Sequence, residues 1–179
     1  EVVLPFAEDV AQQLRSAGLR VKIDDREKMK PGAKYYEWER KGVPLRLEIG
    51  PRDVEGKSAF AARRLGGKKF PVPVDNLVEE VQEVLTGIQA ELLANALARR
   101  VENTHATDSY ADFKERLTRD GGWYLVPWKD SAENEAAIKA DTKATIRCYP
   151  LDAQENLGEK KCFYSGEAAT HMALFARAY

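Results

Sequence analysis

The sequence contains few of the residues that build metal centres, disulfide scaffolds or membrane spans. It has two cysteines and two histidines among 179 residues. Cys148 and Cys162 cannot form a disulfide scaffold, so a reducing cytoplasmic environment is the simpler expectation. No apolar run approaches the roughly 18 residues that a membrane-spanning helix needs, and no charged-then-apolar leader opens the chain. We therefore expect a soluble globular protein in the cytoplasm, with no membrane partner.

Charge is distributed unevenly along the chain, although the net charge is only -1. Residues 1–75 contain 16 Lys and Arg against 12 Asp and Glu, whereas residues 76–179 contain 12 against 17. A basic N-terminal part permits a phosphate-bearing partner such as a nucleic acid but does not require one.

The most informative stretch runs from Lys30 to Asp53, with the sequence KPGAKYYEWERKGVPLRLEIGPRD. Pro31 suits the first turn of a helix, and Gly42 suits its end. Apolar residues then occupy every second position from 45 to 49, which is the period of a strand with one buried face. This pattern predicts a helix over 31–41, a strand over 45–49 and a charged exit loop.

The polar side chains of this stretch predict a recognition surface. Tyr35 and Glu39 lie one helical turn apart, Arg46 lies on the strand, and Arg52 and Asp53 follow it. These groups supply hydrogen-bond donors and acceptors but lack the paired nucleophile and base of a catalytic site. The alternative is an ordinary amphipathic helix and strand whose charges are solvated.

The first part of the chain reads as an α/β domain. Periodicity predicts a helix over residues 6–17 and a strand over 19–23. A hairpin is expected over residues 58–74, with its turn at the Gly66-Gly67 pair and its second strand at a sheet edge because it contains prolines. Four cations are expected near the hairpin tip, where they would bind phosphates or remain solvated: Arg63, Arg64, Lys68 and Lys69.

A long periodic segment follows and predicts a helix from 75 to about 103, long enough to join two domains. Beyond it the pattern predicts a small α+β domain, with helices over 110–117 and 131–140 and strands over 123–126, 144–149 and 172–179. The expected division is therefore an α/β domain over 1–74, a connecting helix over 75–105 and a C-terminal domain over 106–179.

Two pieces of the sequence stand out together: GLRVKIDDREKMKPGAKYYEWERKGVPLRLEIGPRD and the ending FARAY. They resemble the prolyl-tRNA synthetase family of class II aminoacyl-tRNA synthetases, in its archaeal and eukaryotic type. The resemblance implies an anticodon-binding domain with a mixed sheet, a connecting helix and a C-terminal extension. It also implies that this chain is a C-terminal piece of a proline-tRNA ligase, lacking the domain's first strand and inactive alone. ATP and Mg²⁺ would bind an upstream catalytic domain, and the full-length enzyme would be a homodimer.

The resemblance also assigns roles to individual residues. All proline anticodons end in two guanines, and the residues implied to read them in tRNA(Pro) are Tyr35, Glu39, Arg46, Arg52 and Asp53. An arginine can donate to O6 and N7 of guanine, and a carboxylate can accept from its N1–H and amino group. A tyrosine ring can stack on a base.

Two family features are expected to differ or to remain open. Similar proteins often hold zinc with four cysteines, but Cys162 alone cannot form a tetrahedral site, so we expect a degenerate site without zinc and with no other cofactor in this piece. His171 is a lone candidate that is more simply structural. The resemblance implies that the carboxylate of Tyr179 reaches toward the catalytic domain, although Tyr179 could equally end an edge strand.

Two other functions compete with anticodon recognition. One is a free-standing tRNA- or protein-binding module derived from a synthetase. The other is an independent enzyme using Cys162 and His171, which is disfavoured because no orienting acid or oxyanion site accompanies them.

Overall fold

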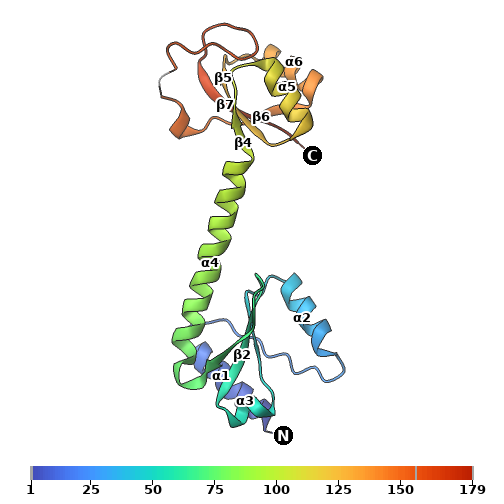
Figure 1. Cartoon of the computed structure of the whole chain (residues 1–179), viewed down its shortest axis with the longest axis vertical. Helices are drawn as coiled ribbons and strands as arrows, with labels where there is room; N and C mark the ends of the chain where they lie inside the picture. Colours follow the sequence, from blue (N-terminus) through green and yellow to red (C-terminus); the bar gives the residue numbers. More distant parts are fainter. Residues whose placement is uncertain (1, 156, 179) are drawn as a thin grey trace. The chain divides into compact units, whose positions relative to one another are not determined.

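The computed structural model describes residues 2–155 and 157–178. The chain divides into two compact units, residues 1–94 and 95–179, which are described separately (Figure 1). The expected mixed α/β architecture with one long helix is confirmed. Among the described residues, no helix is long and apolar enough to cross a membrane.

The first unit combines three helices, a small sheet and the start of a long helix. Its sheet has the order β1-β2-β3, and both pairings are antiparallel. The strands are β1 (Leu45–Glu48), β2 (Ser58–Arg63) and β3 (Phe70–Pro73). The helices are α1 (Val3–Ser16), α2 (Pro31–Arg40) and α3 (Pro51–Glu55), and a 3-10 turn (Val74–Asn76) leads into α4 (Leu77–Glu102).

The core of the first unit lies between α1, the sheet and the start of α4. Its buried members are apolar side chains from these elements: Val10, Leu14, Ala61, Val72, Leu77 and Val81. Figure 1 shows α2 and α4 on opposite sides of the β2-β3 hairpin. The predicted helices over 6–17 and 31–41, the strand over 45–49 and the hairpin over 58–74 are confirmed, and β3 is an edge strand as its prolines indicate.

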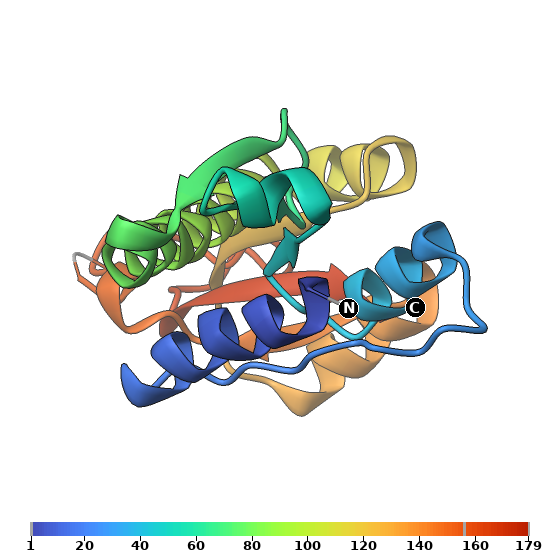
Figure 2. The same cartoon turned by 90° about the horizontal axis from the view of Figure 1, so that it is seen from below.

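The strand predicted over residues 19–23 is wrong. This segment belongs to the extended connection between α1 and α2 that Figure 2 shows. Leu19 and Val21 pack against the core, so the alternating pattern does report burial. A strand also needs a neighbour to complete its hydrogen-bond ladder, and the Val21 carbonyl instead accepts a hydrogen bond from the Arg15 guanidinium at 3.1 Å.

The charged exit loop predicted after β1 is the short helix α3. Pro51 occupies its first turn, where a missing N–H costs nothing. The carboxylate of Asp53 accepts a hydrogen bond from the Gly50 N–H at 2.7 Å and so caps the helix. The segment is therefore helical where a loop was predicted, and the cap from Asp53 stabilises its first turn.

The long helix α4 has 26 residues and confirms the periodic segment. Its buried side chains are Leu77, Val81 and Ile88, all in its first half. In its second half the apolar residues are exposed, and Val101 is 69% exposed.

The second unit is a four-stranded mixed sheet with two helices. Its order is β4-β5-β7-β6, and only the β4-β5 pairing is parallel. The strands are β4 (Thr104–Ala106), β5 (Trp123–Trp128), β6 (Ala144–Cys148) and β7 (His171–Arg177). The helices are α5 (Tyr110–Arg119) and α6 (Ala132–Thr142), with a 3-10 turn at Leu151–Ala153. Ser109 and Ser131 are the N-cap residues of α5 and α6, and their hydroxyls accept hydrogen bonds from backbone N–H groups. Strand β4 has three residues, which are too few to show the alternating pattern of a strand in the sequence.

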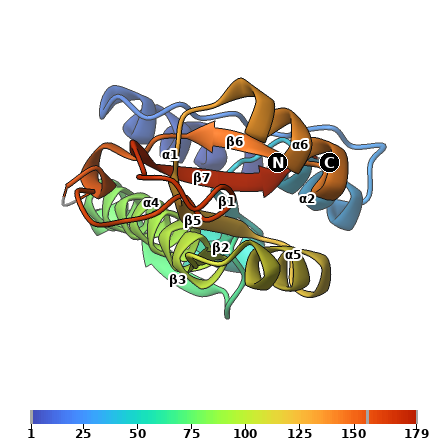
Figure 3. The ribbon, with the colours of Figure 1, turned by 90° about the horizontal axis from the view of Figure 1, so that it is seen from above.

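The last strand lies inside the sheet. Figure 3 shows β7 between β5 and β6, so the alternative of an edge strand ending at Tyr179 is wrong. Tyr179 itself lies outside the described residues. Trp128 is fully buried, and its ring lies 5.3 Å from that of Phe175 and 6.3 Å from that of Phe163. This aromatic packing forms the core of the second unit.

Candidate nucleic-acid interface

Arg46 lies at the centre of the candidate site. Its guanidinium carbon is 3.8 Å from the centre of the Tyr35 ring, in the geometry of a cation–π contact. Its Nη1 donates to Glu39 Oε1 at 2.8 Å, and its Nε donates to Glu48 Oε1 at 3.0 Å. The structure therefore brings Tyr35, Glu39 and Arg46 together, as the sequence predicts.

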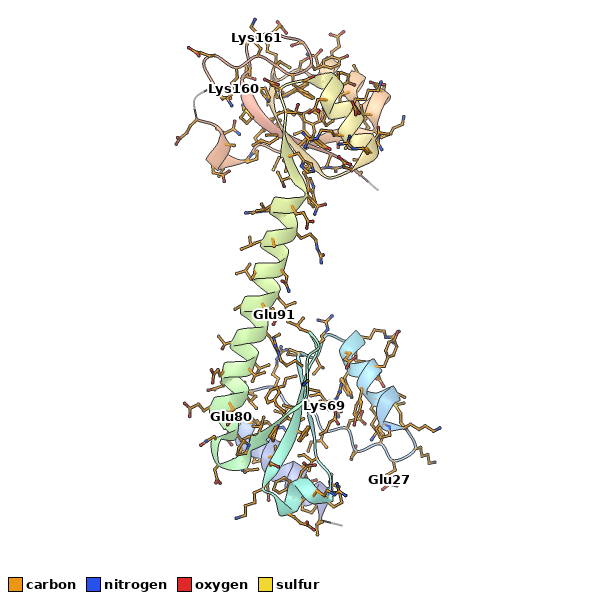
Figure 4. All side chains as sticks on the ribbon, viewed as in Figure 1. Glu27, Lys69, Glu80, Glu91, Lys160 and Lys161 are labelled. Atoms are coloured by element: carbon orange, nitrogen blue, oxygen red, sulfur yellow. The ribbon has the colours of Figure 1, made fainter. Side chains whose placement is uncertain are left out.

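Lys69 completes this group from the β2-β3 connection, where Figure 4 labels it. Its Nζ donates to Glu48 Oε2 at 2.7 Å and lies 5.5 Å from the centre of the Tyr35 ring. We call Tyr35, Glu39, Arg46, Glu48 and Lys69 the Arg46 cluster. Two cations, two carboxylates and one ring thus meet from α2, β1 and the hairpin.

The electrostatics of the cluster favour its charged forms. Burial raises the pKa of Glu48, but hydrogen bonds from Lys69 and Arg46 outweigh it and hold the pKa below the ordinary value. Burial lowers the pKa of Arg46, but hydrogen bonds to Glu39 and Glu48 raise it overall. The pKa of Tyr35 is raised, mainly by burial and by the charge of Glu48, so the phenol stays neutral at pH 7.

The local sequence explains why α2 and β1 face each other. Gly42 has φ +86°, a left-handed conformation that glycine adopts without strain, and it ends α2. The Val43 N–H then donates to the Trp38 carbonyl at 3.0 Å, which folds the chain back toward the helix. The reversal sends β1 back beside α2, so Arg46 reaches Tyr35 and Glu39.

Arg52 and Asp53 are placed differently from the other three predicted readers. Both lie in α3, beyond the end of β1. Within the described ranges, no hydrogen bond or ion pair joins either residue to the Arg46 cluster. The Oδ2 atom of Asp53 is used by the helix cap, whereas Arg52 is exposed.

The cations predicted to gather at the hairpin tip do not form one cluster. Arg63 pairs with Glu91 of α4, which Figure 4 labels. Lys69 turns to the other side and pairs with Glu48, while Arg64 and Lys68 are exposed. The expectation of a single cluster is wrong because alternate positions of a hairpin point to opposite faces.

Glu48 was missed as a site residue by the sequence reasoning. It lies two positions after Arg46, so both side chains share one face of β1. The two-residue spacing of Arg46 and Glu48 could have indicated that Glu48 belongs to the site. The second partner of Glu48, Lys69, comes from a turn distant in sequence and could not be found from this spacing.

The second unit does not offer a zinc site among its described residues. No group of three or more His, Cys, Asp and Glu is placed to hold a metal ion in the part of the chain that the structure describes. Cys162 is buried, and although burial raises the pKa of its thiol, hydrogen bonds from Ser165 and from nearby backbone N–H groups lower it overall. The Cys162 thiol thus accepts hydrogen bonds from the protein, whereas a tetrahedral zinc site would need three further ligands beside it.

His171 has a structural environment. Its ring lies 4.7 Å from that of Tyr149, and its Nδ1 is 3.0 Å from Thr170 Oγ1. Among the described residues, no hydrogen bond joins His171 to Cys162, so the geometry gives no support to an enzyme built on that pair.

The first unit carries the fold of an anticodon-binding domain, since a model of the anticodon binding domain family matches residues 1–84. A second model, described as prolyl-tRNA synthetase, C-terminal, matches residues 110–179. The chain therefore belongs to the prolyl-tRNA synthetase family.

Individual relatives agree with this assignment. A proline–tRNA ligase of Porphyromonas gingivalis is 43% identical over 173 residues, which are 97% of this chain and 34% of the relative. The chloroplastic/mitochondrial proline–tRNA ligase of Arabidopsis thaliana is 41% identical over 183 residues, covering 99% of this chain and 33% of the relative. The chain thus spans about a third of the length of the curated relatives it matches.

A solved structure shares the fold. The prolyl-tRNA synthetase of Cryptosporidium parvum, complexed with halofuginone and AMPPNP, superimposes with a TM-score of 0.89 at 33% identity. The match covers all of this chain and 37% of that one.

Proposed function

We propose that this chain recognises the anticodon of tRNA(Pro) as part of a proline–tRNA ligase, which attaches proline to tRNA using ATP. The observation that carries the proposal is the Arg46–Glu39 ion pair, at 2.8 Å, held beside the Tyr35 ring. The family relationship supports the same function.

The ion pair has the polarity that a guanine edge requires. The Watson–Crick edge of guanine carries the O6 acceptor beside the N1–H and amino donors, and it is accessible when a loop base is unstacked. Arg46 can donate to O6 while Glu39 accepts from N1–H and the amino group. Adenine reverses the first two groups, so the same pair discriminates against it.

The remaining site residues would complete the contact. The Tyr35 ring contacts the Arg46 guanidinium and can stack on a base, which is worth about 1–3 kcal/mol. From α3, Arg52 would donate to the second guanine or hold a phosphate, and Asp53 would accept from a guanine N1–H or amino group. Phosphates of the anticodon stem and loop would meet the exposed cations Arg64 and Lys68, with Arg63 and Lys69 contributing if they leave their partners Glu91 and Glu48.

The whole enzyme is part of the same proposal. Catalysis, with ATP and Mg²⁺, would belong to the part of the relatives outside the third matched here, so the 179-residue chain binds tRNA but does not charge it. The full-length enzyme would be a homodimer in the cytoplasm. Free cysteines at 148 and 162 are consistent with a reducing compartment. We further propose that zinc plays no part in this chain and that the Tyr179 carboxylate reaches toward the catalytic domain.

Binding of this chain to two tRNAs tests the proposal. One tRNA carries a proline anticodon, and the other has one anticodon guanine replaced by adenine, each measured at two salt concentrations. We expect the base change and Arg46→Ala each to weaken binding by about 1–3 kcal/mol, without additivity, because both remove the same contact. Arg40→Ala on the exposed face of α2 is the matched control. Equal, salt-sensitive binding to both tRNAs would reduce the site to a phosphate-binding surface and contradict the proposal.

A further inference from the structure

Helix α2 is not held in place by the apolar core. None of its described residues is fully buried, and none belongs to the core cluster of the first unit. It nevertheless carries Tyr35 and Glu39, which can take part in the proposed recognition of guanine only if they lie beside Arg46. Its position must therefore come largely from polar contacts.

Asp24 makes the most concentrated set of these contacts. Its Oδ2 accepts a hydrogen bond from the Trp38 Nε1–H at 2.7 Å, across 14 residues of sequence. Arg26 grips both carboxylate oxygens, with Nε 2.8 Å from Oδ1 and Nη2 2.7 Å from Oδ2. The Asp24 side chain is only 13% exposed. Partly buried, charge-assisted contacts of this kind favour one geometry, because the alternatives leave charged groups without partners.

Neighbouring contacts tie the same segment to α2 at further points. Lys34 Nζ donates to the Asp24 carbonyl at 3.0 Å. Arg26 also pairs with Glu37 at 2.9 Å, and Glu37 in turn pairs with Lys41 at 2.6 Å. We call the contacts of Asp24 and Arg26 with α2 the Asp24 clasp.

The Asp24 clasp contacts one side of α2, and the residues of β1 and the hairpin in the Arg46 cluster contact another side. The clasp holds positions 34, 37 and 38, whereas Tyr35 and Glu39 point to β1 and Arg46. Successive helical residues are about 100° apart, so rotating α2 by one residue would carry Tyr35 and Glu39 away from Arg46. Fixing the first side therefore fixes the second.

We propose that Asp24 is a positioning residue for anticodon recognition: it locks α2 through Trp38 so that Glu39 and Tyr35 are preorganised around Arg46. This inference rests on the proposed function. Asp24 would not touch the tRNA itself and would act through α2. Its negative charge is essential because Trp38 and Arg26 are both donors, which one carboxylate satisfies at once. The Arg26 hydrogen bond, with help from Trp38, holds the pKa of Asp24 far below its usual range, so the charge is present at pH 7.

Asp24→Asn tests this role with little change in shape. Asp25→Asn is the matched control, because Asp25 is exposed and, among the described residues, its side chain has no hydrogen bond or ion pair. Trp38→Phe removes the other half of the contact and keeps an aromatic ring. Each variant of the 179-residue chain is titrated with tRNA carrying a proline anticodon and with tRNA in which one anticodon guanine is replaced.

We expect Asp24→Asn and Trp38→Phe each to weaken binding of the intact anticodon about fivefold to tenfold. Binding to the guanine-substituted tRNA should stay the same, so the ratio between the two tRNAs falls. The double variant should be no worse than Asp24→Asn alone, because Asp24→Asn already breaks the contact that Trp38→Phe removes. Loss of fold stability alone would weaken binding to both tRNAs equally and would overturn the proposal.

The Trp38 indole N–H gives a second readout in ¹H–¹⁵N NMR spectra. Its resonance should move on Asp24→Asn and stay in place in Asp25→Asn, as expected for a hydrogen bond to a carboxylate. If Asp24→Asn fails to fold, the ratio between the two tRNAs in Trp38→Phe provides the test. A lower ratio than in wild type supports the proposal, and an unchanged ratio contradicts it. Unchanged discrimination in the clasp variants, with discrimination lost in Arg46→Ala, would overturn this inference alone. Discrimination that survives Arg46→Ala as well would overturn the proposed function and the inference with it.

Discussion

The guanidinium of Arg46 lies 3.8 Å from the centre of the Tyr35 ring, while its Nη1 atom donates to Glu39 at 2.8 Å. The ring and the carboxylate together restrict the orientations that are open to the guanidinium. The donor and acceptor groups therefore stand side by side before any ligand arrives. Preorganisation of this kind lowers the ordering cost of binding.

Replacing Arg46 by lysine should separate charge from geometry. Arg46→Lys keeps the positive charge but loses the planar group that stacks on Tyr35 and spans two acceptors. We expect affinity for tRNA with a proline anticodon to fall about tenfold, with the salt dependence of binding nearly unchanged. Filter binding over a range of salt concentrations measures both quantities. Arg40→Lys on a neighbouring turn of chain, in α2, is the control. Wild-type affinity in Arg46→Lys would show that the positive charge alone matters.

The Asp24 clasp should make stability depend on pH in the acid range. The hydrogen bond from Arg26, followed by that from Trp38, lowers the pKa of Asp24 in the folded state despite partial burial. A carboxyl whose folded pKa is depressed stabilises the fold above its unfolded pKa of about 4, and that stabilisation is lost as the pH falls toward the folded value. Asp24→Asn should therefore be less stable than wild type at pH 7, and the difference should shrink at pH 3.

Urea unfolding at the two pH values measures this difference. Asp25→Asn should show no comparable change, because its exposed carboxyl makes no such contacts among the described residues. A stability gap for Asp24→Asn that is equal at pH 7 and pH 3 would mean that the carboxylate charge does not hold the clasp together.

Local rules predicted the elements whose ends are marked by particular residues. Pro31 and Gly42 bound α2, and Ser109 and Ser131 cap α5 and α6 through hydrogen bonds to the backbone three residues on. The strand over 19–23 failed because a strand is defined by its neighbour, which local alternation cannot reveal.

The candidate site was predictable to the extent that its members lie close in sequence. Tyr35, Glu39 and Arg46 belong to one helix-corner-strand unit, and the structure joins them. Lys69 reaches the same place through the pairing of three strands, so its partnership with Glu48 could not be found from spacing. Tertiary pairing decided which charges became site residues.

The second unit should be stable without zinc. Cys162 is surrounded by hydrogen-bond donors instead of further thiolates, and Trp128 packs in an aromatic core. We expect purified protein to contain much less than one zinc per chain, and EDTA to leave its melting temperature unchanged. Metal analysis and thermal unfolding with and without EDTA provide the measurement. Stoichiometric zinc, lost together with stability on chelation, would contradict this prediction.

Two adjacent glycines provide a matched test of the turn that leads into β5. Gly121 and Gly122 have φ values of +70° and +86°, where a residue with a side chain is strained by roughly 1–2 kcal/mol. A Cβ at position 121 meets nothing within 4 Å, but one at 122 would lie 2.7 Å from the Asn103 carbonyl oxygen. That oxygen accepts the Trp123 N–H at 2.8 Å, so it cannot move away without loosening the start of the strand.

Gly122→Ala should therefore destabilise the second unit by at least about 1 kcal/mol more than Gly121→Ala. Urea unfolding followed by tryptophan fluorescence measures the difference, because two of the three tryptophans, Trp123 and Trp128, lie in this unit. Binding to tRNA with a proline anticodon should be unchanged in both variants, since the proposed readers belong to the first unit. Equal losses at the two positions would show that backbone strain alone, and not the close approach of the Asn103 carbonyl, makes glycine necessary here.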